Sequence, residues 1–440
     1  MKTKRILAAL LALLTLLTTA CGGGGKINLG ETKTEETIAA ASDTAAETED
    51  AAQGRSVLHP LKERPNYTLH EGATPEEMRQ TAIRAMRDGL SVTWYPEKTT
   101  TYEYTSPNTG ETIEFRLDAK KTYAGIPYSS SYTGLFHFLE YYDFETGKIS
   151  VPRDDIFTTF IGNDCAGGAL WGIASCVPSF EPSQVGFTRT SPNMVAVGPY
   201  TLPSKAEEPS SEKVCKMNGE QTMYESYACL KPADSVSAMG NPGIAGHYMM
   251  LLEDAHVERN PDGTINGKTS TITIQDQMRG HRTNSPLYVK EEEGETRIYS
   301  GKWGTKVSFE ELWNNFYLPT TCKEFIGESP YILPSVSLDR EVATVDDLAQ
   351  ARVTSQYLLC AFHIRLVDGS GKTAFSRSKV TDYSDMLSGV LKNYSMTSLG
   401  VSGAMLSRSS GLKGDFTLEI DCIDATGTTF EVTRLPVTLS

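Results

Sequence analysis

The segment from Asn163 to Trp171 constrains the fold of this chain more than any other stretch. Asp164 is a good N-cap, so a helix is expected to begin at Cys165. Four small residues follow, and the two glycines among them each cost about 1 kcal/mol relative to alanine inside a helix. Such a sequence makes sense where a second element packs closely against the helix, and a β-strand is the natural candidate.

The position of Cys165 favours chemistry at its sulfur atom. In the first turn of a helix, unsatisfied backbone N–H groups and the helix dipole stabilise a thiolate relative to a thiol. Cys176 falls on the same helical face about three turns further along, and it is expected to pack in the core. Cys165 is therefore the candidate nucleophile.

A predicted β-hairpin further along the chain supplies a candidate general base. His247 precedes an apolar strand over 248–252, and the turn residues at 260–263 send the chain back through a second strand over 271–277. Antiparallel pairing about this turn brings the second strand level with His247. An imidazole on such a strand can exchange a proton with a nearby thiol.

The polar residue that orients the imidazole is less tightly defined by the sequence. The hairpin brings residues 273–276 roughly level with 247–250. Gln275 fits best as the partner of the second ring nitrogen, and Gln277 and Asp276 are the alternatives because the register is open.

Four segments occur in an order that resembles a known family. Together they resemble the NlpC-type, papain-like cysteine peptidases of bacterial cell walls, and the resemblance covers about a third of the chain. The segments are Tyr123-Ala124-Gly125-Ile126-Pro127-Tyr128, the stretch from Asn163 to Trp171, Leu230-Lys231-Pro232-Ala233-Asp234-Ser235-Val236, and Gly246-His247-Tyr248-Met249-Met250-Leu251-Leu252.

The resemblance implies a cysteine hydrolase, and the sequence itself gives no sign of a metal or nucleotide cofactor. Cys165 would attack a peptide or amide carbonyl, His247 would move the proton, and Gln275 would hold the imidazole. Tyr128 and Asp164 would contact the substrate, which in this family is the stem peptide of peptidoglycan. The alternatives are a wall-binding lipoprotein without catalysis and an amidase or acyltransferase acting on another substrate.

The resemblance also implies an α+β fold, with the Cys165 helix packed on an antiparallel sheet in a papain-like domain over residues 55–330. Ala233 takes the position of the family's usual glycine. An insertion over 178–223 is expected to form a lid or a wall that selects substrate, and a disulfide between Cys215 and Cys229 is possible.

The N-terminus has the pattern of an export signal. Residues 1–21 join a basic start to an apolar run that ends in Cys21, and this resembles the signal of bacterial lipoproteins, in which that cysteine is acylated. Residues 22–54 have almost no large apolar side chain and are expected to form a disordered tether. The chain is therefore expected on the outer face of a bacterial membrane, held by a lipid anchor.

Residues 335–440 are expected to form a separate β-rich, sandwich-like domain. Apolar residues alternate from Leu358 to Leu366 and from Phe416 to Cys422, and turn residues lie between such segments. Cys360 and Cys422 are both expected to point into its core, either as a disulfide or as two packed thiols.

Charge and cysteine usage exclude several other classes of protein. The formal net charge of −14 makes nucleic acid a poor partner. Cysteine and histidine spacings give no zinc motif, and eight Cys in 440 residues are too few for a disulfide scaffold.

Overall fold

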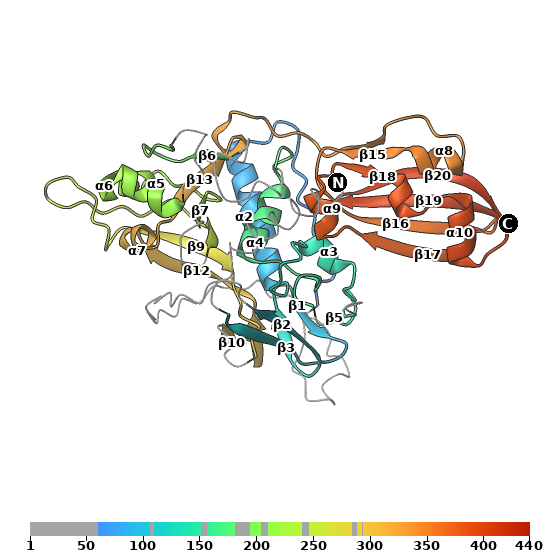
Figure 1. The fold of residues 1–440 in the computed structure, drawn as a ribbon, viewed down its shortest axis with the longest axis horizontal. Coiled ribbons are helices and arrows are strands. Elements are labelled where there is room, and N and C mark those ends of the chain that lie inside the picture. The colour runs from blue at the N-terminus through green and yellow to red at the C-terminus, as the bar shows by residue number, and fades with distance from the viewer. Residues whose placement is uncertain are drawn as a thin grey trace, which may run out of the picture.

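The computed structural model of the chain describes residues 60–105, 110–150, 156–180, 194–203, 210–239, 246–283, 288–292 and 294–440. The predicted signal with Cys21, the tether, and residues 181–193 and 204–209 of the insertion lie outside the described residues. The fold mixes helices with several sheets (Figure 1), so the predicted α+β class is confirmed.

Residues 60–327 form the N-terminal body. Its helices are α2 Pro75–Ser91, α3 Leu135–Leu139, α4 Cys165–Ala174, α5 Ser211–Asn218, α6 Glu220–Tyr227, α7 Phe309–Asn314 and the 3-10 turn η3 Glu324–Ile326. Its strands are β1 Thr93–Pro96, β2 Thr100–Thr105, β3 Thr112–Leu117, β4 Thr122–Ala124, β5 Lys148–Ile149, β6 Met194–Ala196, β7 Ser235–Ala238, β8 His247–Leu251, β9 Thr271–Gln277, β10 Val289–Glu292, β11 Glu295–Tyr299, β12 Gly301–Ser308 and β13 Leu318–Cys322.

A six-stranded antiparallel sheet is the centre of this body, with strand order β12-β9-β8-β7-β13-β6. Helices α2 and α4 cover one face of it, whereas α5, α6 and α7 contribute to a separate apolar cluster on the other face. Alternation along β8 produces this division, because Tyr248 and Met250 join the first cluster while Met249 and Leu251 join the second. The helix that begins at Cys165 therefore packs on an antiparallel sheet.

A five-stranded sheet, β10-β11-β4-β1-β5, and the hairpin β2-β3 complete the body. The long helix α2 begins with a capping box, in which Thr74 and Glu77 satisfy each other's backbone N–H groups. Its apolar side packs along α4. Within the described residues, no helix combines the length and the hydropathy of a membrane span.

The described part of the 178–223 insertion belongs to the sheet and its packing. Strand β6 pairs with β13 at the edge of the six-stranded sheet, and α5 buries Val214 and Cys215 in the cluster beneath it. The possible disulfide is absent, since Cys215 is a buried free thiol and Cys229 is an exposed one. Cys176 is buried as predicted, and its sulfur donates to the backbone oxygen of Met78 over 3.2 Å.

Residues 335–440 form the C-terminal module. Its elements are β14 Val336–Leu338, α8 Val345–Gln350, β15 Arg352–Ser355, β16 Leu359–Val367, β17 Thr373–Val380, α9 Tyr383–Leu387, β18 Asn393–Ser395, the 3-10 turn η4 Met396–Leu399, α10 Gly403–Ser410, β19 Gly414–Asp424 and β20 Thr429–Leu439. The sheet β17-β16-β19-β20 and the smaller sheet β14-β15-β18 share one apolar core.

The prediction for the two cysteines of this module is wrong in one respect. Cys422 lies in the module's own core, but Cys360 joins the apolar cluster of the body, and both are free thiols. A register shift between Leu359 and Ala361 in the pairing of β16 with β19 reverses the alternation at this point. The two side chains therefore serve different cores.

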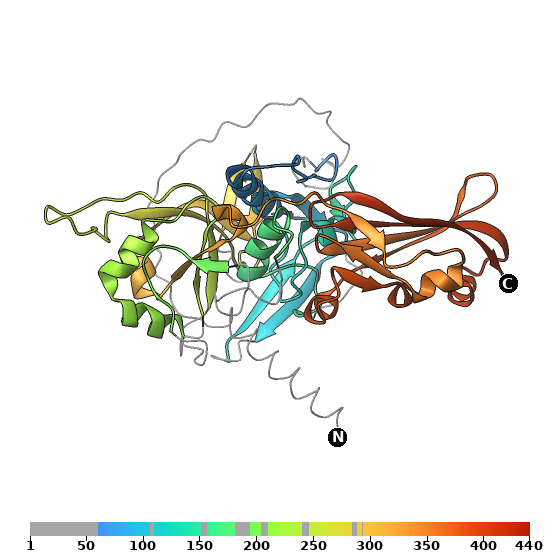
Figure 2. The ribbon, with the colours of Figure 1, turned by 90° about the horizontal axis from the view of Figure 1, so that it is seen from above.

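The module docks onto the body beside α3, and Figures 1 and 2 show the two side by side. The backbone N–H of Tyr67 donates to the Thr426 oxygen over 2.7 Å. His363 and Arg64 both bind the buried carboxylate of Glu140, each over 2.7 Å. Tyr357, Leu358, Cys360, Met386, Leu391, Ile423 and Ala425 enter the same apolar cluster as α2 and α4. Body and module thus share a core.

Candidate active site

Helix α4 begins as the sequence predicts. The Asp164 side chain accepts a hydrogen bond from the backbone N–H of Gly167 over 2.8 Å, and Cys165 is the first helical residue. Cys165 is 2% exposed, and Asp164 is equally buried. Asp164 therefore positions the nucleophile candidate as a helix cap, while its contact with substrate stays a prediction.

The glycines of α4 allow the expected close packing. A Cβ atom at Gly168 would lie 3.1 Å from the Cβ of Gln277 in β9. One at Gly172 would lie 2.9 Å from the Cβ of Met86 in α2 and 3.3 Å from the Cε of Met250 in β8. The helix therefore touches both strands and α2 along one stripe, which also contains Cys165.

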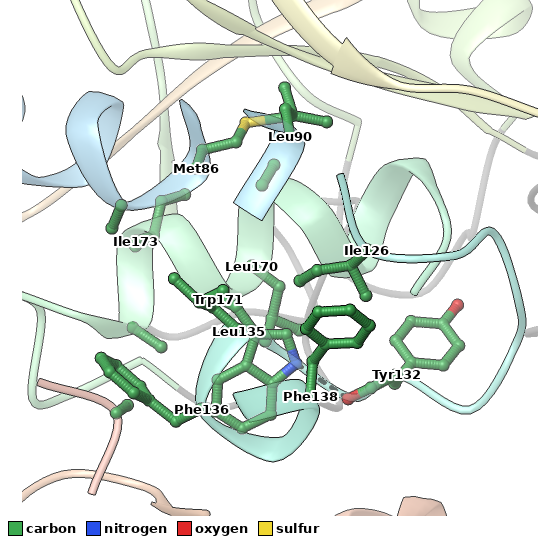
Figure 3. Packing of buried hydrophobic residues seen from close by; sticks show 14 of the residues in the cluster. Met86, Leu90, Ile126, Tyr132, Leu135, Phe136, Phe138, Leu170, Trp171 and Ile173 are labelled. Atoms are coloured by element: carbon green, nitrogen blue, oxygen red, sulfur yellow. Dashed lines mark hydrogen bonds between the residues drawn. The ribbon is translucent and has the colours of Figure 1, made fainter. Parts of the chain in front are cut away.

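Trp171 anchors another side of α4. Figure 3 shows its indole beside Leu135, and its Nε1 donates to the Tyr132 backbone oxygen over 2.8 Å. The helix is thus held between α3 and the sheet, which fixes the place of its first residue.

Replacing Gly172 with alanine should destabilise the chain by about 1–3 kcal/mol, because the new methyl group meets the backbone oxygen of Ala82 at 3.0 Å. The matched control is Gly403→Ala in α10, where the nearest atom, in the Val345 side chain, is 3.6 Å away. Chemical denaturation measures both variants. Equal stabilities for the two variants would contradict the tight contact of α4.

The start of α4 lies level with the start of β8. Gly172 lies against Met250 of β8, and Gly168, four residues earlier, lies against Gln277 of β9. Met250 pairs with Gln275, so Gln277 is level with Tyr248. Four helical residues advance about 6 Å, and two strand residues advance about 6.6 Å, so the helix and the strand keep in step. Three residues before Gly168, Cys165 is level with His247 along the strand axis, but the two lie on opposite faces of the sheet.

The partner of His247 is Asp276. The imidazole Nε2 lies 2.7 Å from Oδ2 of Asp276, whose side chain is 2% exposed, whereas the His247 side chain is 15% exposed. The sequence placed Asp276 among the alternatives and preferred Gln275, and that preference is wrong. The Gln275 amide instead donates to the backbone oxygen of Ile83 over 3.1 Å and faces the sulfur of Met250.

Alternation along β9 explains the difference. Gln275 and Gln277 face α2 and α4, so Asp276 projects from the other side of the strand. His247 likewise alternates with Met250 on β8. The His247–Asp276 pair therefore lies on the side of the sheet away from α4. Among the described contacts, none joins the Cys165 sulfur to the His247 imidazole.

The contact with Asp276 assigns roles to the two nitrogens of the imidazole. A carboxylate accepts hydrogen bonds, so Nε2 carries the hydrogen and Nδ1 has a free lone pair. Nδ1 is thus the atom that can take a proton from a nucleophile. Asp276 does what the sequence assigned to Gln275.

Tyr128 and Gln277 position the segment that precedes the nucleophile. Gln277 donates to the backbone oxygen of Ile126 over 2.8 Å, and Tyr128 forms a bridge with Asn163, two residues before Cys165. The Tyr128 ring is 4% exposed and stacks at 6.2 Å on Phe115. Its contact with substrate stays a prediction, and its packing role is what the contacts show.

The turn before β7 is held by an ion pair that sequence reasoning missed. Arg79 of α2 binds Asp234 over 2.6 Å, and both side chains are almost fully buried. Arg79 also donates to the backbone oxygens of Pro232 and Phe325. Ala233 adopts a left-handed φ of 63°, a conformation that glycine adopts more readily than other residues. Asp234 therefore holds the conformation of this turn through its ion pair with Arg79.

The described residues contain no group of three or more His, Cys, Asp or Glu side chains that could hold a metal ion. No family model matches the chain, and no curated protein is similar to it.

Proposed function

We propose that this chain is a papain-like cysteine hydrolase that cleaves peptide or amide bonds. The observation that carries the proposal is the hydrogen-bonded His247–Asp276 pair at the end of the sheet on which the helix that begins at Cys165 packs. A buried carboxylate on one ring nitrogen leaves the other nitrogen to act as a base.

The proposed mechanism uses these three side chains and requires the His247 imidazole to reach the Cys165 sulfur around the end of the sheet. His247 Nδ1 takes the proton of the Cys165 thiol, and the thiolate attacks the substrate carbonyl carbon. Backbone N–H groups at the start of α4 stabilise the oxyanion, and the imidazolium, held by Asp276, returns the proton to the leaving amine. Water then hydrolyses the thioester, which restores the thiol and releases the acid.

The substrate and the location rest on the sequence. The family that the ordered motifs resemble cleaves stem peptides of peptidoglycan, and we propose the same substrate class here. The N-terminal signal ending at Cys21 favours a lipid anchor on the outer face of a bacterial membrane. An enzyme tethered there would meet cell-wall peptides directly. A wall-binding protein without catalysis and an acyl transferase are the competing functions.

The proposal is tested by the pH dependence of alkylation in the chain from residue 55 onward, with the modified cysteines mapped by mass spectrometry. Cys165 should keep reacting with iodoacetamide well below the ordinary free-thiol pKa of about 8.5, at a pH where labelling of the exposed Cys229 has stopped. His247→Ala should remove this difference.

Burial slows the alkylation of Cys165 at every pH, so the test compares how the rates of Cys165 and Cys229 change with pH and not the rates themselves. If Cys165 and Cys229 follow the same profile, and His247→Ala leaves both unchanged, the nucleophile assignment fails and the wall-binding function takes its place. For an activated thiol, the fate of the acyl group of a muropeptide separates hydrolysis from transfer, because water gives a free carboxylic acid and a second acceptor gives a new amide or ester.

A further inference from the structure

A second pocket in the N-terminal body contains none of the residues of the candidate active site. It lies among the end of β3, the turn before β4, and the chain that follows β9. The polar side chains that line it are Arg116, Asp118, Lys121, His281, Arg282 and Thr283. Tyr123 and Ile298 form its apolar wall.

His281, which lines this pocket, has an unpaired acceptor. Its side chain is 2% exposed, and its Nε2 lies 3.2 Å from the backbone oxygen of Ala124 and 3.0 Å from that of Ile298. Two carbonyl oxygens accept only, so Nε2 carries the hydrogen and Nδ1 has the lone pair. Nδ1 is buried and has no partner among the described residues.

The same pocket holds a second unpaired atom. Thr283 Oγ1 is buried and also lacks a hydrogen-bond partner in the described part of the chain. Each such atom costs about 1–3 kcal/mol when it stays unpaired. Burial lowers the pKa of His281 to about 4, so its imidazole stays neutral and Nδ1 remains an acceptor at neutral pH. A ligand that carries hydroxyl groups would satisfy both atoms.

The charge of the pocket selects an anion. Arg116, Lys121 and Arg282 line it against the single carboxylate of Asp118, although the whole chain carries a formal net charge of −14. Within the described ranges, none of these three cations forms a salt bridge. Unpaired arginine and lysine side chains that converge on one pocket are suited to a carboxylate.

We propose that this pocket binds a small hydroxylated carboxylate of the sugar-acid class. The carboxylate lies against the cations, one hydroxyl group donates to His281 Nδ1, and a second hydroxyl bonds Thr283 Oγ1. Asp118 accepts from a further hydroxyl group at the rim. This binding does not depend on the proposed hydrolase activity, because none of these side chains takes part in that mechanism.

Isothermal titration of the full chain with glucuronate tests the proposal. We expect saturable binding of glucuronate, and at least about tenfold weaker binding of cyclohexanecarboxylate, which has the ring and the carboxylate but no hydroxyl groups. Glucose, which lacks the charge, should also bind at least about tenfold more weakly than glucuronate.

A pair of neighbouring lysines supplies the matched variants. Lys121→Gln removes a cation that lines the pocket, and Lys120→Gln removes the same charge from an exposed neighbour outside the lining. The first should weaken glucuronate binding about tenfold, and the second should leave it unchanged. Both side chains are exposed, so both variants should fold.

Three results would overturn the proposal. If glucuronate shows no saturable binding, the pocket holds water only. Equal binding of cyclohexanecarboxylate shows that the hydroxyl groups, and with them His281 Nδ1, do not contribute. Equal effects of the two lysine variants show that the anion responds to overall charge and not to this pocket.

Discussion

Asp276→Ala is expected to slow hydrolysis at Cys165 by about a hundredfold or more, because His247 loses the group that fixes its ring and stabilises its protonated form. Asp276→Asn should recover part of the rate, since the amide oxygen can still accept the Nε2 hydrogen but carries no charge. The measurement is the release of amine from a peptide substrate, together with the alkylation profile of Cys165.

The neighbouring glutamine is the control for this experiment. Gln275→Ala removes a buried hydrogen bond to Ile83, so it should lower the free energy of unfolding by about 1 kcal/mol and leave the alkylation profile of Cys165 in place. If Gln275→Ala and not Asp276→Ala changed that profile, the assignment of Asp276 would be wrong.

Arg79→Met should produce the largest loss of stability, about 3–5 kcal/mol, because it leaves the buried carboxylate of Asp234 without its charge partner. The pair lies at the contact of α2 with the turn before β7, and Arg79 also satisfies the backbone oxygens of Pro232 and Phe325. Chemical denaturation gives the free energy of unfolding.

Arg340→Met is the comparison for this variant, because Arg340 pairs with Asp339 at the surface and such pairs contribute about 0–1 kcal/mol. A loss for Arg79→Met no greater than that for Arg340→Met would show that the turn does not depend on the buried pair.

Local patterns in the sequence were sufficient where neighbouring residues decide the structure. The start of α4 follows from the cap at Asp164, and its close packing follows from the glycines at 168 and 172. These features depend on backbone N–H groups and on the absence of a Cβ atom, both of which can be read from the residue types.

The partner of His247 could not be fixed in the same way. A long connection separates β8 from β9, so a one-residue difference in register exchanges the faces of Gln275 and Asp276. The pairing of Arg79 with Asp234 joins residues 155 positions apart, and no local motif points to it. Cys360 was misplaced because the irregular pairing at Leu359 and Ala361 leaves no mark in the pattern of apolar residues.

The core shared by body and module has a consequence for how this protein survives in a cell. Tyr357, Leu358 and Ile423 of the module lie in the same apolar cluster as α2 and as α4, the helix that begins at Cys165. A chain that ends before residue 335 would leave that surface open to water, and exposed apolar surface favours aggregation and proteolysis. Selection on the chemistry proposed for Cys165 would therefore act on the whole folded chain, because the module cannot be exchanged without exposing the core of the body.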